Sequence, residues 1–140
     1  MTNINPHDLA GRYIALWTEP DAALRRKAIE HLWAEDGAHI LEPPVEIREA
    51  AAALGFNFTA LEARGYDALE GRVTRSYERF VASGQFTFRP RDDAVRLRNV
   101  VKFGWETVSA DGGEAVSGGL EVLVLDDDGL IKTDYMFPGA

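Results

Sequence analysis

The chain has 140 residues with 46% hydrophobic and 27% charged side chains, which is the size and composition of one soluble globular domain. Its net charge of −8 disfavours binding to nucleic acid or to an anionic membrane surface, because both reward a positive patch. The absence of cysteine excludes disulfides, zinc–thiolate sites and thiol nucleophiles. The N-terminus has no basic stretch followed by an apolar run, so no signal peptide is predicted and a cytoplasmic location is the expectation.

The first part of the chain predicts two amphipathic helices and a strand. Asn5-Pro6 supplies an N-cap and a first-turn proline, and apolar residues over Leu9–Trp17 recur at helical spacing. Glu19-Pro20-Asp21 separates this helix from a second one, which is predicted to end at Gly37. A short strand over Ala38–Glu42 follows and stops before two prolines.

The middle of the chain predicts two more helices around an irregular stretch. An Ala-rich helix covers Val45–Leu54. Phe56 and Phe58 then stand outside any periodic pattern, which suits a pocket lid or a partner surface. The next long helix opens with a capping-box pattern at Asp67 and ends at Ser83-Gly84.

The last third of the chain predicts strands. Gln85–Arg89 alternates aromatic and polar residues, as a half-buried strand does. Three long antiparallel strands follow, separated by Asp- and Gly-rich turns, over Val100–Ser109, Glu114–Leu125 and Leu130–Phe137. Early helices and late strands, without repeat or linker, predict one α+β domain over residues 1–140 with the helices layered on a curved antiparallel sheet.

Glu121 is a charged residue within an apolar strand, and the strand register decides its environment. A three-residue hairpin loop pairs it with Phe103 and pairs Gly119 with Trp105, which buries the carboxyl and makes room for an indole. A two-residue loop pairs it with Lys102 instead, as an ordinary exposed pair. In the buried case, desolvation raises the pKa of Glu121, so that it donates a hydrogen bond as a neutral acid. The sequence leaves both registers open.

Three stretches resemble the SnoaL-like, nuclear transport factor 2-like superfamily. They are Gly11–Trp17, Leu32–Ala38 with the strand ending at Glu42-Pro43, and Leu123–Ile131 with Asp134–Phe137. The resemblance implies a cone: a strongly curved antiparallel sheet with helices on its concave face, an apolar pocket inside, and usually a homodimer. The superfamily holds isomerases, cyclases, dehydratases, epoxide hydrolases and non-enzymes, so it implies a fold more than a function.

Ketosteroid isomerase is one member of that superfamily, and three of its functional positions match residues of this chain. Tyr13 matches a first-helix tyrosine, Glu42 matches the general base that precedes a proline, and Glu121 matches a protonated carboxyl in the oxyanion site. The resemblance implies that Glu42 is the base and that Tyr13 and Glu121 stabilise an enolate. Both carboxylates are glutamate here rather than aspartate, so the substrate does not carry over.

Each of these residues also fits a purely structural interpretation. Tyr13 suits a core position with one hydrogen bond, and Glu42 suits an exposed strand end. Strict alternation puts His39 and Glu42 on opposite strand faces, which favours a half-exposed histidine over a catalytic pair. The remaining histidines have no partner at ligand spacing, so the sequence predicts no metal site and no cofactor.

Six aromatic residues are predicted to line the pocket and bind substrate: Trp33, Phe56, Phe103, Trp105, Tyr135 and Phe137. The leading functional prediction is a homodimeric enzyme that abstracts a proton from a small hydrophobic carbonyl compound, in isomerisation, cyclisation or dehydration. The alternative is a non-catalytic ligand-binding or dimerisation domain. Epoxide hydrolysis is a third interpretation, but it needs paired acids and an arginine around a water, which the sequence does not bring together.

Overall fold

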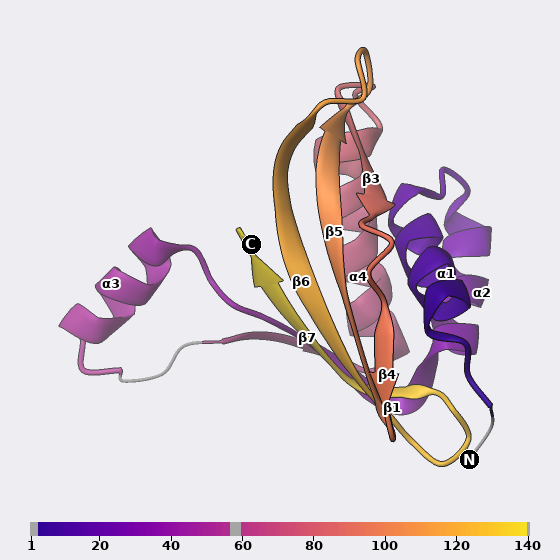
Figure 1. The fold of residues 1–140 in the computed structure, drawn as a ribbon. Coiled ribbons are helices and arrows are strands. Elements are labelled where there is room, and N and C mark those ends of the chain that lie inside the picture. Colours follow the sequence, from indigo (N-terminus) through magenta and orange to yellow (C-terminus); the bar gives the residue numbers. More distant parts are fainter. Residues whose placement is uncertain (1–2, 57–59, 140) are drawn as a thin grey trace.

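Helices cover one face of a twisted sheet (Figure 1). The computed structural model describes residues 3–56 and 60–139, and in these residues a seven-stranded sheet carries the strand order β2-β1-β7-β6-β5-β3, with β4 also pairing with β5. The helices on its face are α1 (Pro6–Thr18), α2 (Ala22–Leu32) and α4 (Tyr66–Ser76), which continues into the π-helical turn η1 (Tyr77–Val81). The strands are β1 (Trp33–Leu41), β2 (Leu61–Arg64), β3 (Phe86–Pro90), β4 (Val95–Leu97), β5 (Val100–Ser109), β6 (Ala115–Leu125) and β7 (Ile131–Pro138).

The predicted α+β class is confirmed, with one refinement of the sheet. Strands β1 and β7 run parallel, whereas the other paired strands run antiparallel, so the sheet is mixed. The short strands β2 and β4 were not predicted, because so few residues carry little pattern of their own and depend on a neighbouring strand. No helix among the described residues has the length and apolar character needed to cross a membrane.

Local sequence signals set the start of the first two helices. The Asn5 side chain accepts hydrogen bonds from two backbone N–H groups of α1, and Asp21 does the same for α2. Helix α2 ends at Leu32 rather than at Gly37, because the chain enters β1 already at Trp33. The buried side of α1 contributes Leu9, Tyr13 and other residues to the core between helices and sheet.

A bulge in β6 decides the register of the hairpin that carries Glu121. Next to the turn, Val108 pairs with Ala115, which is the register that a two-residue hairpin loop would give. The pairing then skips Val116, and from Thr107 onward the register is shifted by one residue. Glu121 therefore pairs with Phe103, as the three-residue loop predicted, and its side chain faces the helices.

A second bulge, in β7, decides which side chains of the last strand face inward. The pairing of β6 with β7 skips Lys132, so Ile131 and Asp134 both lie on the buried face although they are three residues apart. Beyond the bulge, Tyr135 and Phe137 lie on the opposite face of the sheet, where they are 39% and 40% exposed.

Helix α3 (Val45–Ala53) stands away from the body of the domain, between the ends of β1 and β2 (Figure 1). None of its residues is buried. Ile47 is 46% exposed, and Leu54 and Phe56 just beyond the helix are 78% and 61% exposed. Phe58, which the sequence grouped with Phe56, lies outside the described residues.

We expect the uncovered outer face of the sheet to associate with a second copy of the chain. Leu120 and Val122 are only half-buried there, and Tyr135 and Phe137 add aromatic area. Sedimentation at tens of micromolar protein should show a homodimer, because a large apolar interface holds at that concentration. Phe137→Glu should shift the equilibrium toward the monomer, while Leu24→Glu at a comparably exposed site on helix α2, away from this face, should not. A monomeric wild type would contradict the expectation.

Candidate functional site

The Tyr13 hydroxyl lies between two buried carboxyl groups. Tyr13 comes from α1, Glu121 from β6 and Asp134 from the neighbouring strand β7. The Tyr13 Oη is 2.6 Å from Asp134 Oδ2 and 3.0 Å from Glu121 Oε2. The exposed fractions of the three side chains are 1% or less. An aromatic shell surrounds the hydroxyl-bearing ring, with the Phe103 and Trp33 centroids 5.5 and 5.8 Å away.

Counting hydrogens shows that one of the two carboxyls holds a proton. A tyrosine hydroxyl has a single hydrogen and donates to one carboxyl at a time. The 2.6 Å contact with Asp134 is typical of a hydroxyl that donates to a carboxylate. Burial raises the pKa of Glu121 well above its ordinary value, and the negative Asp134 nearby raises it further. Glu121 therefore acts as the neutral acid that donates to Tyr13, and the Tyr13 hydroxyl donates to Asp134.

Trp105 completes this network at its outer end. Its indole Nε1–H donates to Glu121 Oε1 over 3.1 Å, which leaves Oε2 to carry the Glu121 proton. Trp105 lies directly over Gly119 on the paired strand, where a Cβ would overlap the indole. Tyr13, Glu121 and Asp134 are buried, whereas Trp105 is half-buried. Of these four described residues, Trp105 is therefore the one that reaches solvent.

His39 and Arg72 approach the same cluster from the other side. His39, on β1, pairs with Asp134 across the parallel strands, and its Nε2 is 3.9 Å from Asp134 Oδ2. The Arg72 guanidinium, on α4, lies 2.9 Å from His39 Nδ1 and donates to the backbone carbonyls of His39 and Leu61. Burial lowers the pKa of His39 below its ordinary value, which keeps the imidazole neutral.

Three of these side chains have the composition of a metal site. Ligand atoms of His39, Glu121 and Asp134 lie within 4.8 Å of one another. However, a guanidinium nitrogen only donates hydrogen bonds, so His39 Nδ1 must be the acceptor and Nε2 must carry the hydrogen. The nitrogen that faces the carboxylates then has no free lone pair, and the arrangement fits hydrogen-bond donation better than metal binding.

The structure brings two of the three predicted catalytic residues together and leaves the third apart. Tyr13 and Glu121 are hydrogen-bonded. Glu42 follows the last residue of β1 and is half-buried, and its backbone N–H donates to the Met136 carbonyl. Its side chain has no hydrogen bond or ion pair with the Tyr13 cluster among the described residues.

The six predicted pocket residues separate into two groups. Trp33, Phe103 and Trp105 lie against the Tyr13 cluster. Tyr135 and Phe137 lie on the outer face of the sheet, and Phe56 is exposed beyond α3. The bulge at Lys132 separates the groups, because it reverses which side chains of β7 point inward.

Three polar residues of the cluster were not predicted from the sequence. Asp134 alternates with Tyr135 on a regular strand, and only the bulge turns it inward. Arg72 belongs to the polar side of a helix pattern and was not considered. His39 was interpreted as half-exposed, which is wrong: it is 1% exposed, because α4 and its Arg72 cover β1. The alternation that placed His39 and Glu42 on opposite faces of the strand was the sequence signal that could have identified His39 as the inward residue.

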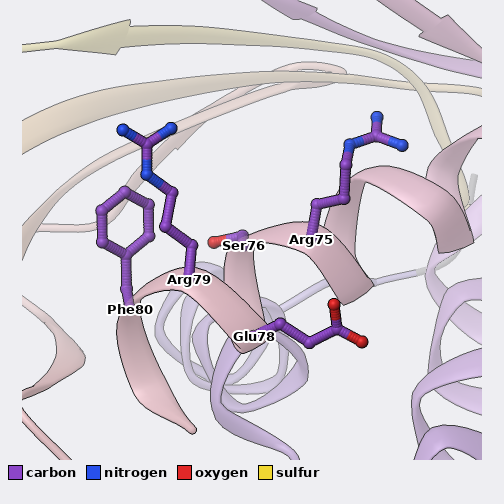
Figure 2. A pocket seen from close by; sticks show the side chains of 5 residues that line it. All are labelled: Arg75, Ser76, Glu78, Arg79 and Phe80. Carbon is purple, nitrogen blue, oxygen red and sulfur yellow. The ribbon is translucent and has the colours of Figure 1, made fainter. Parts of the chain in front are cut away.

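The described residues form two surface pockets. One of about 200 Å³ is lined by Ile40, Leu41, Glu42, Ala60, Tyr135, Met136 and Phe137, at the root of the α3 arm. The other, of about 480 Å³, is shown in Figure 2; Arg75, Ser76, Glu78, Arg79 and Phe80 line it. Because these five residues come from consecutive turns of one helical segment, it is an open depression, and no member of the Tyr13 cluster lines either pocket.

The raised pKa of Glu121 predicts how stability changes with pH. The folded protein binds this proton more tightly than the unfolded chain does, so the free energy of unfolding falls as pH rises above the ordinary glutamate pKa of about 4.3. Glu121→Gln removes this titration. Its stability relative to wild type should therefore rise between about pH 5 and pH 8. Urea unfolding across this range measures the difference, with exposed Glu114→Gln as the control. A difference that does not change with pH would contradict a buried, protonated Glu121.

Comparison with models of known families and with curated proteins gives no match. The fold does match solved structures. A candidate isomerase of the SnoaL-like family from Agrobacterium tumefaciens str. C58 has a TM-score of 0.76 at 21% identity, over 96% of this chain and 97% of that one. A SnoaL-like protein of unknown function from Burkholderia thailandensis E264 has a TM-score of 0.59 at 14% identity, over 99% and 100%.

A protein with a cystatin-like fold from Silicibacter pomeroyi DSS-3 also matches, with a TM-score of 0.60 at 14% identity, over 98% of this chain and 76% of that one. The chain therefore has the SnoaL-like, nuclear transport factor 2-like fold that its motifs indicated. At these identities the likeness establishes the fold, and the function has to be argued from the site.

Proposed function

We propose that the protein is an enzyme that moves protons on a small hydrophobic carbonyl compound, by isomerisation, cyclisation or dehydration. The observation that carries the proposal is the buried Tyr13 hydroxyl, in contact with two buried carboxyl groups, of which Glu121 has a pKa raised by burial. Acid–base catalysis needs a proton donor and a proton acceptor side by side in a site that excludes water, and this cluster supplies both.

The geometry suggests a role for each group. Tyr13 and protonated Glu121 donate hydrogen bonds to the carbonyl oxygen of the substrate and stabilise the enolate that forms. Tyr13 turns from Asp134 to the substrate for this purpose. Asp134 then accepts the proton from the carbon next to the carbonyl, and returns it to another carbon or to a departing hydroxyl. Protons and charge balance without a cofactor.

Trp105 is the gate that such a reaction requires. Tyr13, Glu121 and Asp134 are enclosed, whereas the Trp105 indole is partly exposed and covers Glu121. Gly119 beneath the indole has no side chain, so the indole lies directly against the backbone of the paired strand. Movement of Trp105 away from Glu121 frees Oε1 and opens a path for the substrate.

Proton exchange tests the proposal without knowledge of the natural substrate. A panel of small cyclic and aromatic ketones is incubated with the protein in D₂O, and NMR follows the loss of hydrogen next to the carbonyl. The wild type should accelerate exchange on at least one ketone relative to matched buffer, and folded Tyr13→Phe should be slower. No acceleration across the panel would reject the enzymatic function.

The packing of the cluster favours one second candidate, a non-catalytic ligand-binding domain. Phe103 is 1% exposed and Trp33 is fully buried, so the rings enclose a hydrogen-bonded network that also serves as a structural core. This function predicts saturable binding of hydrophobic carbonyl compounds, seen as a change in tryptophan fluorescence, with no proton exchange.

A further inference from the structure

His39 presents an unpaired hydrogen-bond donor next to an unpaired acceptor of Asp134. His39 Nε2 and Asp134 Oδ1 are buried and have no hydrogen-bond partner in the structure. The nearest approach of the two side chains, His39 Nε2 to Asp134 Oδ2, is 3.9 Å, which is too long for a hydrogen bond. Buried polar groups without partners are uncommon in folded proteins, and such a pair indicates a place for a missing polar group.

Two neighbours hold the imidazole in this orientation. Arg72 Nη1 lies 2.9 Å from Nδ1, and because a guanidinium cannot accept, Nδ1 carries no hydrogen. The Trp17 ring packs against the imidazole, with the centroids 5.4 Å apart. Burial lowers the pKa of His39, so the ring stays neutral and keeps its single hydrogen on Nε2. Arg72 is thus a positioning residue that fixes the tautomer.

The chemistry of the two free atoms selects the group that fits between them. It has to accept a hydrogen bond from Nε2–H and donate one to Oδ1. A hydroxyl group or a water molecule does both, whereas a carbonyl only accepts and an ammonium only donates. The other oxygen of the same carboxylate, Oδ2, is bonded to Tyr13, which the proposed function assigns to the substrate carbonyl.

We propose that His39 and Asp134 bind a hydroxyl group of the substrate, which makes the substrate class an α- or β-hydroxy carbonyl compound. The carbonyl oxygen of the substrate then lies at Tyr13 and Glu121, on the Oδ2 side of Asp134, and the hydroxyl lies at Oδ1 of the same carboxylate. The placement of the carbonyl rests on the proposed function. The hydroxyl site itself rests only on the two unpaired atoms and on the tautomer that Arg72 fixes.

Nitrogen NMR of the histidine side chains tests the tautomer directly. In wild type, the His39 signal, assigned by its loss in His39→Phe, should show Nε2 protonated and Nδ1 unprotonated. Arg72→Met should weaken this preference, while Arg75→Met on the exposed side of α4 should not. A protonated Nδ1 in wild type, or a Zn²⁺-induced shift that places the metal on Nε2, would overturn the proposal.

Binding of phenol, catechol and resorcinol tests the hydroxyl site, because a phenol oxygen resembles an enol oxygen and the diols add a second hydroxyl. Catechol or resorcinol should bind about three- to tenfold tighter than phenol, the value of one neutral hydrogen-bonded group. His39→Phe should abolish this ratio. His39→Gln should restore part of it, since its amide N–H can replace Nε2–H, and exposed His31→Phe should keep it.

The outcomes separate the two proposals. A ratio of one in wild type, or a ratio that survives His39→Phe, overturns the hydroxyl site even if ketone exchange is observed. A ratio that behaves as expected without any ketone exchange supports the hydroxyl site and rejects the enzymatic function. Absence of binding by all three probes overturns the hydroxyl site.

Discussion

Asp134→Asn should slow proton exchange on a responsive ketone by about 10²- to 10⁴-fold, the usual contribution of a positioned general base. Asparagine keeps the size of the side chain and cannot accept the proton. Glu42→Gln should leave the rate within about twofold of wild type, because its side chain has no described contact with Tyr13 or Glu121. Rates are measured by NMR in D₂O at equal protein concentration.

This pair of variants decides between two assignments of the base. The resemblance to ketosteroid isomerase assigns the base to Glu42, whereas the contacts of the Tyr13 hydroxyl assign it to Asp134. Circular dichroism should show both variants folded. If Glu42→Gln loses exchange while Asp134→Asn keeps it, the base is Glu42 and substrate binding must bring it to the cluster.

Glu121→Leu should reduce the exchange rate by about 10²- to 10³-fold, the cost of removing one donor from an oxyanion site. Glu121→Gln should lose less, because its amide still donates a hydrogen bond to a developing enolate oxygen. The leucine variant should also be less stable than the glutamine variant, since it leaves the Trp105 indole N–H without its partner. Exchange rates and urea unfolding of both variants measure these differences.

Two control measurements distinguish a specific effect of Glu121 on exchange from a general loss of folded protein. Val122→Ala lies on the neighbouring position of β6 and on the opposite face, and it should change stability without a specific loss of exchange. Phenol binding should survive in Glu121→Gln more than in Glu121→Leu. Equal exchange in the two Glu121 variants would mean that Glu121 donates no hydrogen bond to the reacting oxygen.

The sequence by itself determined the elements whose signals are local. The cap at Asn5, the helix break at Glu19-Pro20-Asp21, the Asp- and Gly-rich turns and the three long strands were all predicted, because capping, turn chemistry and alternation depend on residues close in the chain. Together with the family motifs, they were enough for the fold. They also identified Tyr13 and Glu121 as candidate site residues.

Only the tertiary structure decided which polar groups meet. A skipped residue at Val116 turned Glu121 inward, and another at Lys132 turned Asp134 inward and Tyr135 outward. A bulge forms where paired strands have to fit into a curved sheet, and the alternation of residues along one strand does not show where it will lie. The burial of His39 likewise depends on helix α4, which places Arg72, 33 residues further along the chain, 2.9 Å from His39 Nδ1.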